Sequence, residues 1–117
     1  MTVISLNVRG VGGYPKSLAL KRLFYLVKPY LVMIQETMVD GFNEREVFSR
    51  IFLAWYFYAV DSKGFFRGLQ SAWNTKKTNF NAFFTLARIL LEGFVKRFNK
   101  KLKLINCYGS YANKQSF

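Results

Sequence analysis

The sequence predicts an α/β fold in which a mixed sheet with two helices is followed by antiparallel strands. Two short apolar segments, residues 3–7 and 31–35, each end in polar residues, and the amphipathic segment 17–27 lies between them. This order predicts two neighbouring strands of one sheet, with a right-handed crossover if they are parallel. The segments beyond residue 64 favour antiparallel strands. With 117 residues the chain can bury one modest core, so we expect one domain or a piece of one.

The first half of the chain supplies the predicted mixed sheet. A strand over residues 2–7 precedes a helix, for which Pro15 pre-sets the backbone. Residues at helical spacing give this helix one apolar face: Leu20, Leu23, Phe24 and Val27. The helix should stop at Lys28, because Pro29 disfavours a helical conformation in the residue before it. Residues 31–35 form a strand that is apolar without alternation, as expected for a strand covered on both faces.

The rest of the chain predicts further short elements. A turn at residues 40–41 should precede a shorter helix over 44–51, capped by Asn43, and a strand over 55–60. A turn at 62–64 then leads to strands at 68–73, 79–85 and 89–96, the last two as a pair. Helix is the competing interpretation of Leu90 and Leu91. A hairpin turn at Asn99 and Lys100 leads to a last strand over 102–108.

Polar side chains follow the first two strands where each one ends. Asn7 and Glu36 should emerge close together at one edge of the sheet, and chemistry in α/β sheets is placed beyond such strand ends. An amide and a carboxylate held together suit Mg²⁺, which takes oxygen ligands. The alternatives are a turn asparagine that bonds its own backbone, and a solvated carboxylate at a strand end. For Gln35 a structural hydrogen-bonding role is the more common one.

The net charge of +12, from 18 basic and 6 acidic residues, points to a polyanionic partner. We expect weak, non-specific binding of double-stranded DNA. Five basic residues flank the predicted hairpin turn and could present one ridge: Lys96, Arg97, Lys100, Lys101 and Lys103. The alternative is that basic residues only solvate the surface.

Several function classes are excluded or disfavoured by composition. The only cysteine is Cys107 and there is no histidine, so an intrachain disulfide and a zinc site of the usual kind are not expected. The most apolar window, residues 51–60, is too short to span a membrane, and we expect no membrane partner. We also expect no small-molecule cofactor. Nothing in the sequence indicates an oligomeric state.

Four stretches of the chain resemble motifs of a known family, in the family's order and spacing. They read LNVRG, IQET, GLQSAWN and LINCYGSY at residues 6–10, 34–37, 68–74 and 104–111. The chain thus resembles the N-terminal part of the exonuclease–endonuclease–phosphatase superfamily, and most of all the endonuclease domain of plant LINE-type retrotransposon polyproteins. This resemblance implies a four-layered α/β sandwich of two packed sheets. Residues 1–117 would be a truncated domain of about half that size, in which one sheet lacks its partner.

The resemblance also implies roles for individual residues. Glu36 matches the metal-ligand glutamate, and Asn7 matches the asparagine that orients substrate or metal. Tyr108 matches a tyrosine whose hydroxyl points at the scissile phosphate, with a core aromatic residue as the alternative. Arg9 stands where apurinic endonucleases commonly carry an aspartate and retrotransposon members carry arginine, which supports the narrower resemblance. We also count Arg9 among the candidate nucleic-acid contacts.

The departures from the family pattern are informative. The chain has no histidine, and the family's Asp-x-Asn pair and Ser-Asp-His set are missing. In the glycine stretch 64–69, where glycines allow positive φ or close backbone approach, Phe66 and Arg67 replace small residues. Ser110 replaces the proline that should follow Tyr108 and a glycine.

These departures predict a remnant of a Mg²⁺-dependent DNA endonuclease without turnover. A single carboxylate should hold Mg²⁺ only weakly. The alternatives are a basic nucleic-acid-binding module without chemistry, and a non-functional translation product that needs another half to fold.

Overall fold

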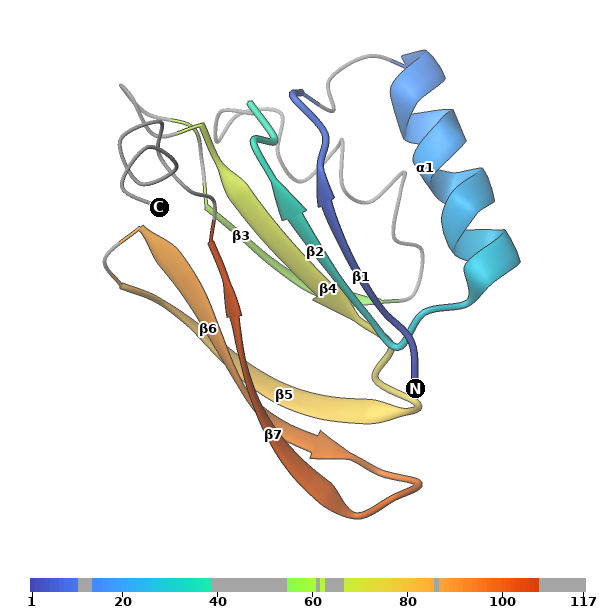
Figure 1. Ribbon diagram of the computed structural model, residues 1–117, viewed down its shortest axis with the longest axis vertical. Helices are drawn as coiled ribbons and strands as arrows, with labels where there is room; N and C mark the ends of the chain where they lie inside the picture. Colours follow the sequence, from blue (N-terminus) through green and yellow to red (C-terminus); the bar gives the residue numbers. More distant parts are fainter. Residues whose placement is uncertain (11–13, 39–54, 61, 63–66, 86, 108–117) are drawn as a thin grey trace, which may run out of the picture.

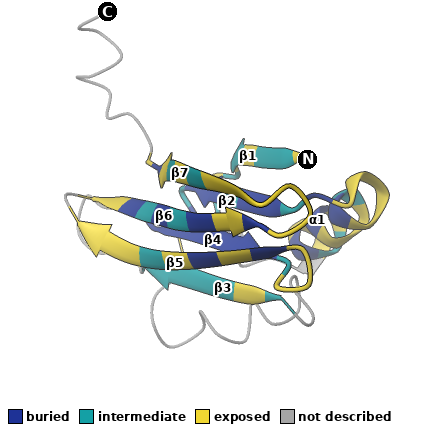
Figure 2. Ribbon diagram, turned by 90° about the horizontal axis from the view of Figure 1, so that it is seen from below, coloured by how far each residue is buried: buried dark blue, intermediate teal, exposed yellow. Residues whose placement is uncertain are grey.

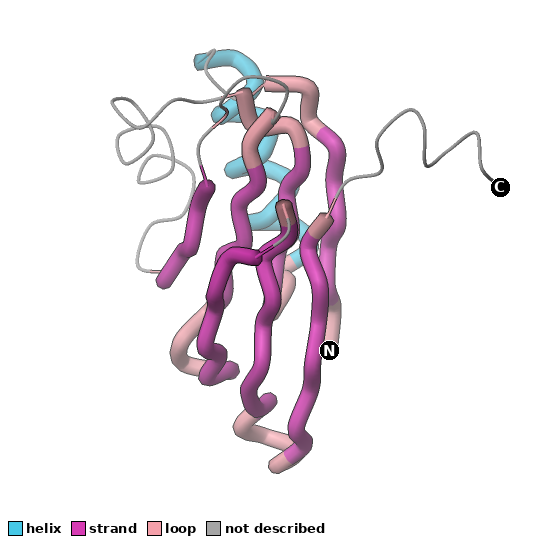
Figure 3. Tube along the Cα trace, turned by 90° about the vertical axis from the view of Figure 1, so that its left-hand side faces the viewer, coloured by secondary structure: helices cyan, strands magenta, loops and turns pink. Residues whose placement is uncertain are grey.

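The computed structural model describes residues 1–10, 14–38, 55–60, 62, 67–85 and 87–107. Within these ranges the chain forms one α-helix and seven β-strands, arranged as two sheets with the helix on one side (Figure 1). In Figure 3, which looks from the side away from the helix, the strands lie in front and α1 lies behind them. No described helix has the length and apolar character that crossing a membrane requires.

The four-stranded sheet contains β1 (Val3–Asn7), β2 (Leu31–Gln35), β4 (Leu69–Trp73) and β3 (Tyr56–Val60), in that spatial order. Strands β1 and β2 are parallel, whereas β4 is antiparallel to both β2 and β3. The predicted strand–helix–strand unit is therefore confirmed, because α1 connects the two parallel strands. All five residues of β4 and four of the five in β2 are buried, as expected for strands covered on both faces.

Helix α1 (Tyr14–Val27) begins three residues before the predicted start at residue 17. Leu20 and Phe24 are buried and pack on residues of β2 and β4. The expectation that Val27 shares this face is wrong: its side chain is 40% exposed, because the helix ends there and the chain turns at Lys28. Lys28 adopts a positive φ of 52° and its N–H donates to the Phe24 carbonyl oxygen (2.9 Å), which closes the helix before Pro29.

The three-stranded sheet is antiparallel and contains β5 (Thr78–Thr85), β6 (Arg88–Val95) and β7 (Lys100–Asn106). Leu90 and Leu91 thus lie in a strand, and the helix interpretation is wrong for them. The hairpin turn also differs from the prediction, since it spans residues 96–99, with Asn99 at a φ of 48°, and Lys100 already belongs to β7. The described part of the last strand starts two residues earlier than predicted and ends at Asn106.

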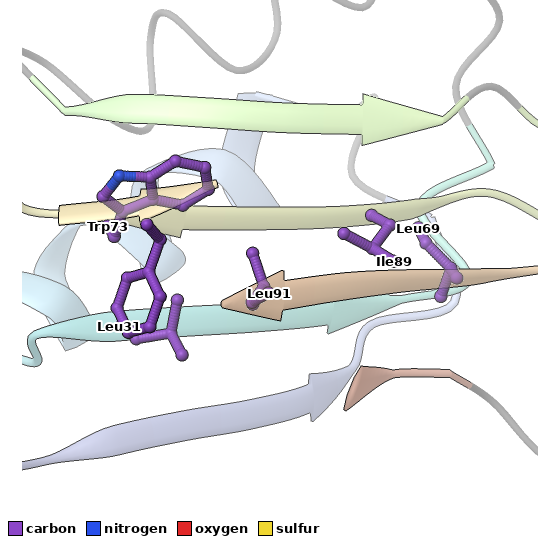
Figure 4. Close-up of a cluster of buried hydrophobic side chains, with 6 residues drawn as sticks. Leu31, Leu69, Trp73, Ile89 and Leu91 are labelled. Atoms are coloured by element: carbon purple, nitrogen blue, oxygen red, sulfur yellow. The ribbon is translucent and has the colours of Figure 1, made fainter. Parts of the chain in front are cut away.

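The larger core lies between the two sheets (Figure 4). Leu31, Leu69 and Trp73 from the four-stranded sheet meet Ile89 and Leu91 from β6. The expectation that one sheet would lack its partner is therefore wrong, because β5 to β7 themselves form a second sheet against the first. A separate cluster fills the space between α1 and the other face of the four-stranded sheet.

Some predicted features lie outside the described residues. These are the helix over 44–51 with its cap Asn43, the turn at 40–41, most of the turn at 62–64, and Tyr108.

Candidate functional site

The carboxyl ends of β1 and β2 meet at one edge of the four-stranded sheet, beside the start of β4. The register pairs Asn7 with Gln35, and Gln35 with Leu69. Asn7 and Glu36 therefore lie on adjacent strand ends, the juxtaposition that the sequence predicts. We call this part of the molecule, formed by Asn7, Glu36 and Arg67, the Glu36 edge.

Backbone hydrogen bonds hold the two parallel strand ends together beyond the sheet itself. The Val8 N–H donates to the Gln35 carbonyl oxygen (3.1 Å) and the Gly10 N–H donates to the Glu36 carbonyl oxygen (2.7 Å). Arg9 and Glu36 both adopt the left-handed conformation, with φ of 51° and 55°, which is uncommon for residues other than glycine. Arg9 is exposed just beyond the end of β1, and hydrogen bonds of the two neighbouring residues, Val8 and Gly10, hold its backbone in place.

The start of β4 is held on the other side of β2 in the same way. The Thr37 N–H donates to the Gly68 carbonyl oxygen (3.3 Å) and the Met38 N–H donates to the Arg67 carbonyl oxygen (2.7 Å). Gly68 has a φ of 90°, and a Cβ atom at this position would overlap Thr37 Oγ1. Both reasons for a glycine that the sequence suggested, positive φ and close approach, therefore apply at Gly68.

Glu36 has a charged neighbour that the sequence did not reveal. The Arg67 Nε atom lies 3.7 Å from Glu36 Oε1, and the side chains are 54% and 20% exposed. Because Arg67 is largely exposed and the contact is long, the pair contributes little to stability, about 0–1 kcal/mol. Its chemical effect is more direct, because a guanidinium stands beside the carboxylate that a cation would have to reach.

The residues that the structure describes do not fit a tightly held metal ion. Among them there is no group of three or more Asp, Glu, His or Cys side chains that could surround a cation. Glu36 is a single carboxylate and already faces Arg67, whereas Mg²⁺ in proteins is usually held by one or two carboxylates together with substrate phosphates. The roles of Asn7, Glu36 and Tyr108 in binding or catalysis stay predictions.

The five basic residues of the predicted ridge all lie on or beside the β6–β7 hairpin: Lys96, Arg97, Lys100, Lys101 and Lys103. They do not all face the same way. Lys101 and Lys103 both approach Glu92, at 3.5 and 3.8 Å, whereas the Lys96 ammonium group donates to the Thr75 carbonyl oxygen (2.8 Å) in the turn between β4 and β5. The hairpin therefore carries two groups of positive charge, and the role of either group in DNA binding is a prediction.

A buried amide network lies beneath the Glu36 edge and links the two sheets. Gln35 Nε2 donates to Ser5 Oγ (3.0 Å) and to Asn106 Oδ1 (2.9 Å), which confirms a structural role for Gln35. Asn106 Nδ2 donates in turn to the Gln70 carbonyl oxygen (2.8 Å) and to Ser71 Oγ (3.0 Å). Sequence reasoning missed Asn106, although an asparagine at the end of an apolar strand and within a recognised motif was a usable signal.

The Gln70 side chain is the exception in this polar interior. It is fully buried, and neither of its amide atoms has a hydrogen-bond partner among the described residues. Its register neighbours are Ile34 on β2 and Ala59 on β3, both apolar. Within the described part of the chain, no hydrogen bond offsets the desolvation cost of this amide.

Solved structures share this arrangement of strands and helix. The chain is similar to the AP endonuclease LMAP from Leishmania major, with a TM-score of 0.71 at 15% identity over 97% of this chain and 43% of that one. It is also similar to humanized D. rerio TDP2 with 14 mutations, with a TM-score of 0.59 at 17% identity over 97% of this chain and 49% of that one. No protein-family model and no curated protein matches the sequence.

These similarities establish the fold, a partial α/β sandwich of the kind found in both of these proteins. The expected fold class is therefore confirmed. The chain spans less than half the length of either of these two proteins.

Proposed function

We propose that this chain is a remnant of a metal-dependent DNA endonuclease from a LINE-type, non-LTR retrotransposon, and that residues 1–117 are a truncated domain without turnover of its own. The observation that carries the proposal is the parallel register of β1 and β2, which sets Asn7 beside Glu36 on a fold shared with an AP endonuclease. The four family motifs in the sequence support the narrower, retrotransposon origin.

The lack of turnover follows from what phosphodiester hydrolysis requires. The reaction needs a positioned water, a group that takes its proton, and stabilisation of the developing charge. The chain has no histidine, and the carboxylates among the described residues are Glu36, which faces Arg67, and Glu92, which faces two lysines. Of the three requirements, the Glu36 edge supports only a part of the last. Asn7 would orient a phosphate there and the Tyr108 hydroxyl would approach it.

A plasmid-nicking assay with Mg²⁺ tests this proposal. We expect no nicking by the wild-type chain, and none by Glu36→Ala run beside it. Mg²⁺-dependent nicking that is lost in Glu36→Ala would overturn the claim of inactivity and show that this half of the fold suffices. Nicking that persists in Glu36→Ala would identify a contaminating nuclease, and further purification should then remove it from both samples.

Non-specific binding of double-stranded DNA is the second function that we propose, and the net charge of +12 favours it. Lys101 and Lys103 have highly exposed side chains, at 59% and 76%, so they can reach phosphates despite the nearby Glu92. Binding should be weak, with a Kd of about 10⁻⁴ to 10⁻⁶ M at physiological salt.

A salt titration of binding to a mixed-sequence duplex tests this second function. Affinity should fall steeply as salt rises, because bound phosphates release their counterions. A variant carrying both Lys101→Gln and Lys103→Gln should bind more weakly and show a shallower salt dependence. Binding that does not change with salt would contradict the proposal.

A further inference from the structure

A groove of about 370 Å³ lies on the side of the molecule between β3 and β5, which are edge strands of the two sheets. Figure 2 shows these strands running next to each other, below the rest of the sandwich. Its lining combines aromatic rings with the amides of one strand: Tyr56, Tyr58, Trp73, Phe80, Asn79 and Asn81. The volume lies within the range of small-molecule sites, about 300–1,000 Å³.

The groove lies away from the Glu36 edge. Strand β4 begins with Leu69, which pairs with Gln35 next to Glu36, and ends with Trp73, which pairs with Leu31 and Tyr56. The groove opens at this second end of β4, and none of its lining residues belongs to the Glu36 edge. Its function therefore does not depend on the proposed endonuclease ancestry.

The aromatic rings of the groove are held in a fixed order. Trp73 and Phe80 are buried, with ring centroids 6.0 Å apart and planes at 75°, so they form a rigid wall. Tyr56 packs against Trp73 at 5.1 Å between centroids and is itself 58% exposed. Tyr56 thus presents an open ring face whose position is set by a buried neighbour, which is the arrangement of a stacking platform.

Positive charge borders one end of this groove. Thr75 belongs to its lining, and the Lys96 ammonium group contacts the Thr75 carbonyl oxygen at 2.8 Å. The next two residues of the same turn, Lys76 and Lys77, are exposed. Lys77 Nζ lies instead 4.7 Å from the centre of the Tyr30 ring, which is not part of the groove lining. Positive charge from two connections, Lys96 and the exposed Lys76, therefore lies next to Thr75 at one end of the aromatic groove.

We propose that this groove binds single-stranded nucleic acid. A base would stack on Tyr56, the amides of Asn79 and Asn81 would contact its edge, and Lys76 and Lys96 would hold the adjacent phosphates. Stacking on an aromatic side chain next to a basic track is how proteins bind single strands without sequence preference. A duplex cannot use the platform, because its bases are already stacked and paired. A neutral sugar or an aromatic peptide would fit the ring but would leave Lys76 and Lys96 without a function.

The test compares a fluorescein-labelled single strand of about 12 nucleotides with the blunt duplex of the same sequence, by fluorescence anisotropy. The variants are Tyr56→Ala and, as matched control, Phe83→Ala, another exposed aromatic residue (48%) that lies on β5 but outside the groove lining. We expect Tyr56→Ala to weaken single-strand binding about tenfold and to leave duplex binding unchanged. Phe83→Ala should change neither.

Further variants keep the test decisive. Tyr56→Phe retains the ring and should bind like the wild type, which separates loss of stacking from loss of folding. Single-strand binding is measured by anisotropy without added Mg²⁺ and the endonuclease proposal by plasmid nicking, so that failure here and failure of the proposed endonuclease ancestry can be told apart. A ribonucleotide strand of the same sequence shows whether the groove distinguishes the two sugars.

Three results would overturn the proposal. One is an equal loss of single-strand and duplex binding in Tyr56→Ala, and another is unchanged single-strand binding in that variant. The third is displacement of the oligonucleotide by a neutral oligosaccharide or by an uncharged aromatic peptide, which would assign the groove to that ligand instead.

Discussion

The two sheets differ in how they are covered. In the four-stranded sheet, β4 is buried along its whole length, with α1 and its cluster on one face and the three-stranded sheet on the other. The three-stranded sheet buries only the face that meets its partner, so along β6 buried residues alternate with more exposed ones. Its other face shows large apolar side chains to solvent, including Phe83, Phe94 and Ile105.

This difference decides what a polar side chain costs in each sheet. In the four-stranded sheet a buried amide has no access to water and must find a protein partner. Gln35 has such partners, whereas Gln70 has none among the residues that the structure describes. In the three-stranded sheet, Asn79 and Asn81 are exposed, and water can hydrogen-bond them. The same chemical group should therefore have a large mutational effect where it is buried between the sheets and a small one where it is exposed.

The largest effect that we expect comes from a glycine in the three-stranded sheet. A Cβ atom on Gly93 would overlap the backbone of β5 at Asn79 and Phe80, and a strand backbone cannot yield as a side chain can. Gly93→Ala should lower the free energy of unfolding by about 3 kcal/mol or more, measured by urea denaturation. The control is Gly10→Ala, where φ is 106° but the added Cβ meets only ordinary contacts, with an expected loss of about 1–2 kcal/mol. If Gly93→Ala and Gly10→Ala lose the same stability, the close packing of β5 on β6 is not what makes Gly93→Ala destabilising.

A somewhat smaller loss should follow when the link between the sheets is cut. Asn106→Ala removes the partner of Gln35 and leaves Ser71 and the Gln70 carbonyl with an unmet hydrogen bond. We expect a loss of about 2–3 kcal/mol in the free energy of unfolding. Asn81→Ala, the same substitution at an exposed position, should change stability by less than about 0.5 kcal/mol. If the two variants lose the same amount, burial of Asn106 against the four-stranded sheet is not what makes it important.

A gain in stability is expected at Gln70. Replacing this buried amide by leucine removes two polar atoms that have no partner among the described residues. Gln70→Leu should therefore raise the free energy of unfolding by about 1 kcal/mol, which thermal denaturation would show as a higher melting temperature. The same change at Gln35 should lower the melting temperature, because that amide is hydrogen-bonded. A loss in Gln70→Leu would mean that its side chain has a partner in a part of the chain beyond the described residues.

The smallest effect should occur on the exposed face of the three-stranded sheet. Glu92 faces Lys101 and Lys103 there, with its side chain 41% exposed. Glu92→Gln should change stability by less than about 1 kcal/mol, and the difference should shrink at high salt. A large, salt-independent loss would show that this ion network is not an ordinary surface one.

Sequence periodicity was sufficient for most of the fold. The residues 31–35 were predicted as a strand with the bounds that the structure shows, because an apolar run between a proline turn and polar residues has few alternatives. The turn at 96–99 was placed incorrectly, because Asn99 at positive φ can end a four-residue turn as well as begin a shorter one. The packing of the two sheets against each other could not be predicted either, since it depends on contacts between residues far apart in the chain.

The features of the candidate site that depend on the order of strand ends could be predicted from the sequence. The features that depend on how distant strands pack could not. The adjacency of Asn7 and Glu36 follows from two parallel strands. The pairing of Glu36 with Arg67 does not, because it requires β4 to be inserted beside β2 rather than at the edge of the sheet. For the same reason the groove between β3 and β5 could not be predicted, because its lining comes from three strands and a turn.

The hydrogen bond between Gln35 and Asn106 joins residues 71 positions apart, and this separation bears on how the chain acquires its structure. During synthesis β2 emerges long before β7. The Gln35 side chain and the β4 backbone therefore remain hydrated until β7 is made and packs over them. Closing so long a loop is entropically unfavourable until the contacts at its end form, which slows folding in proteins rich in such contacts. We therefore expect the sandwich to assemble late and cooperatively, with the arrival of β7 as the step that expels water from between the sheets.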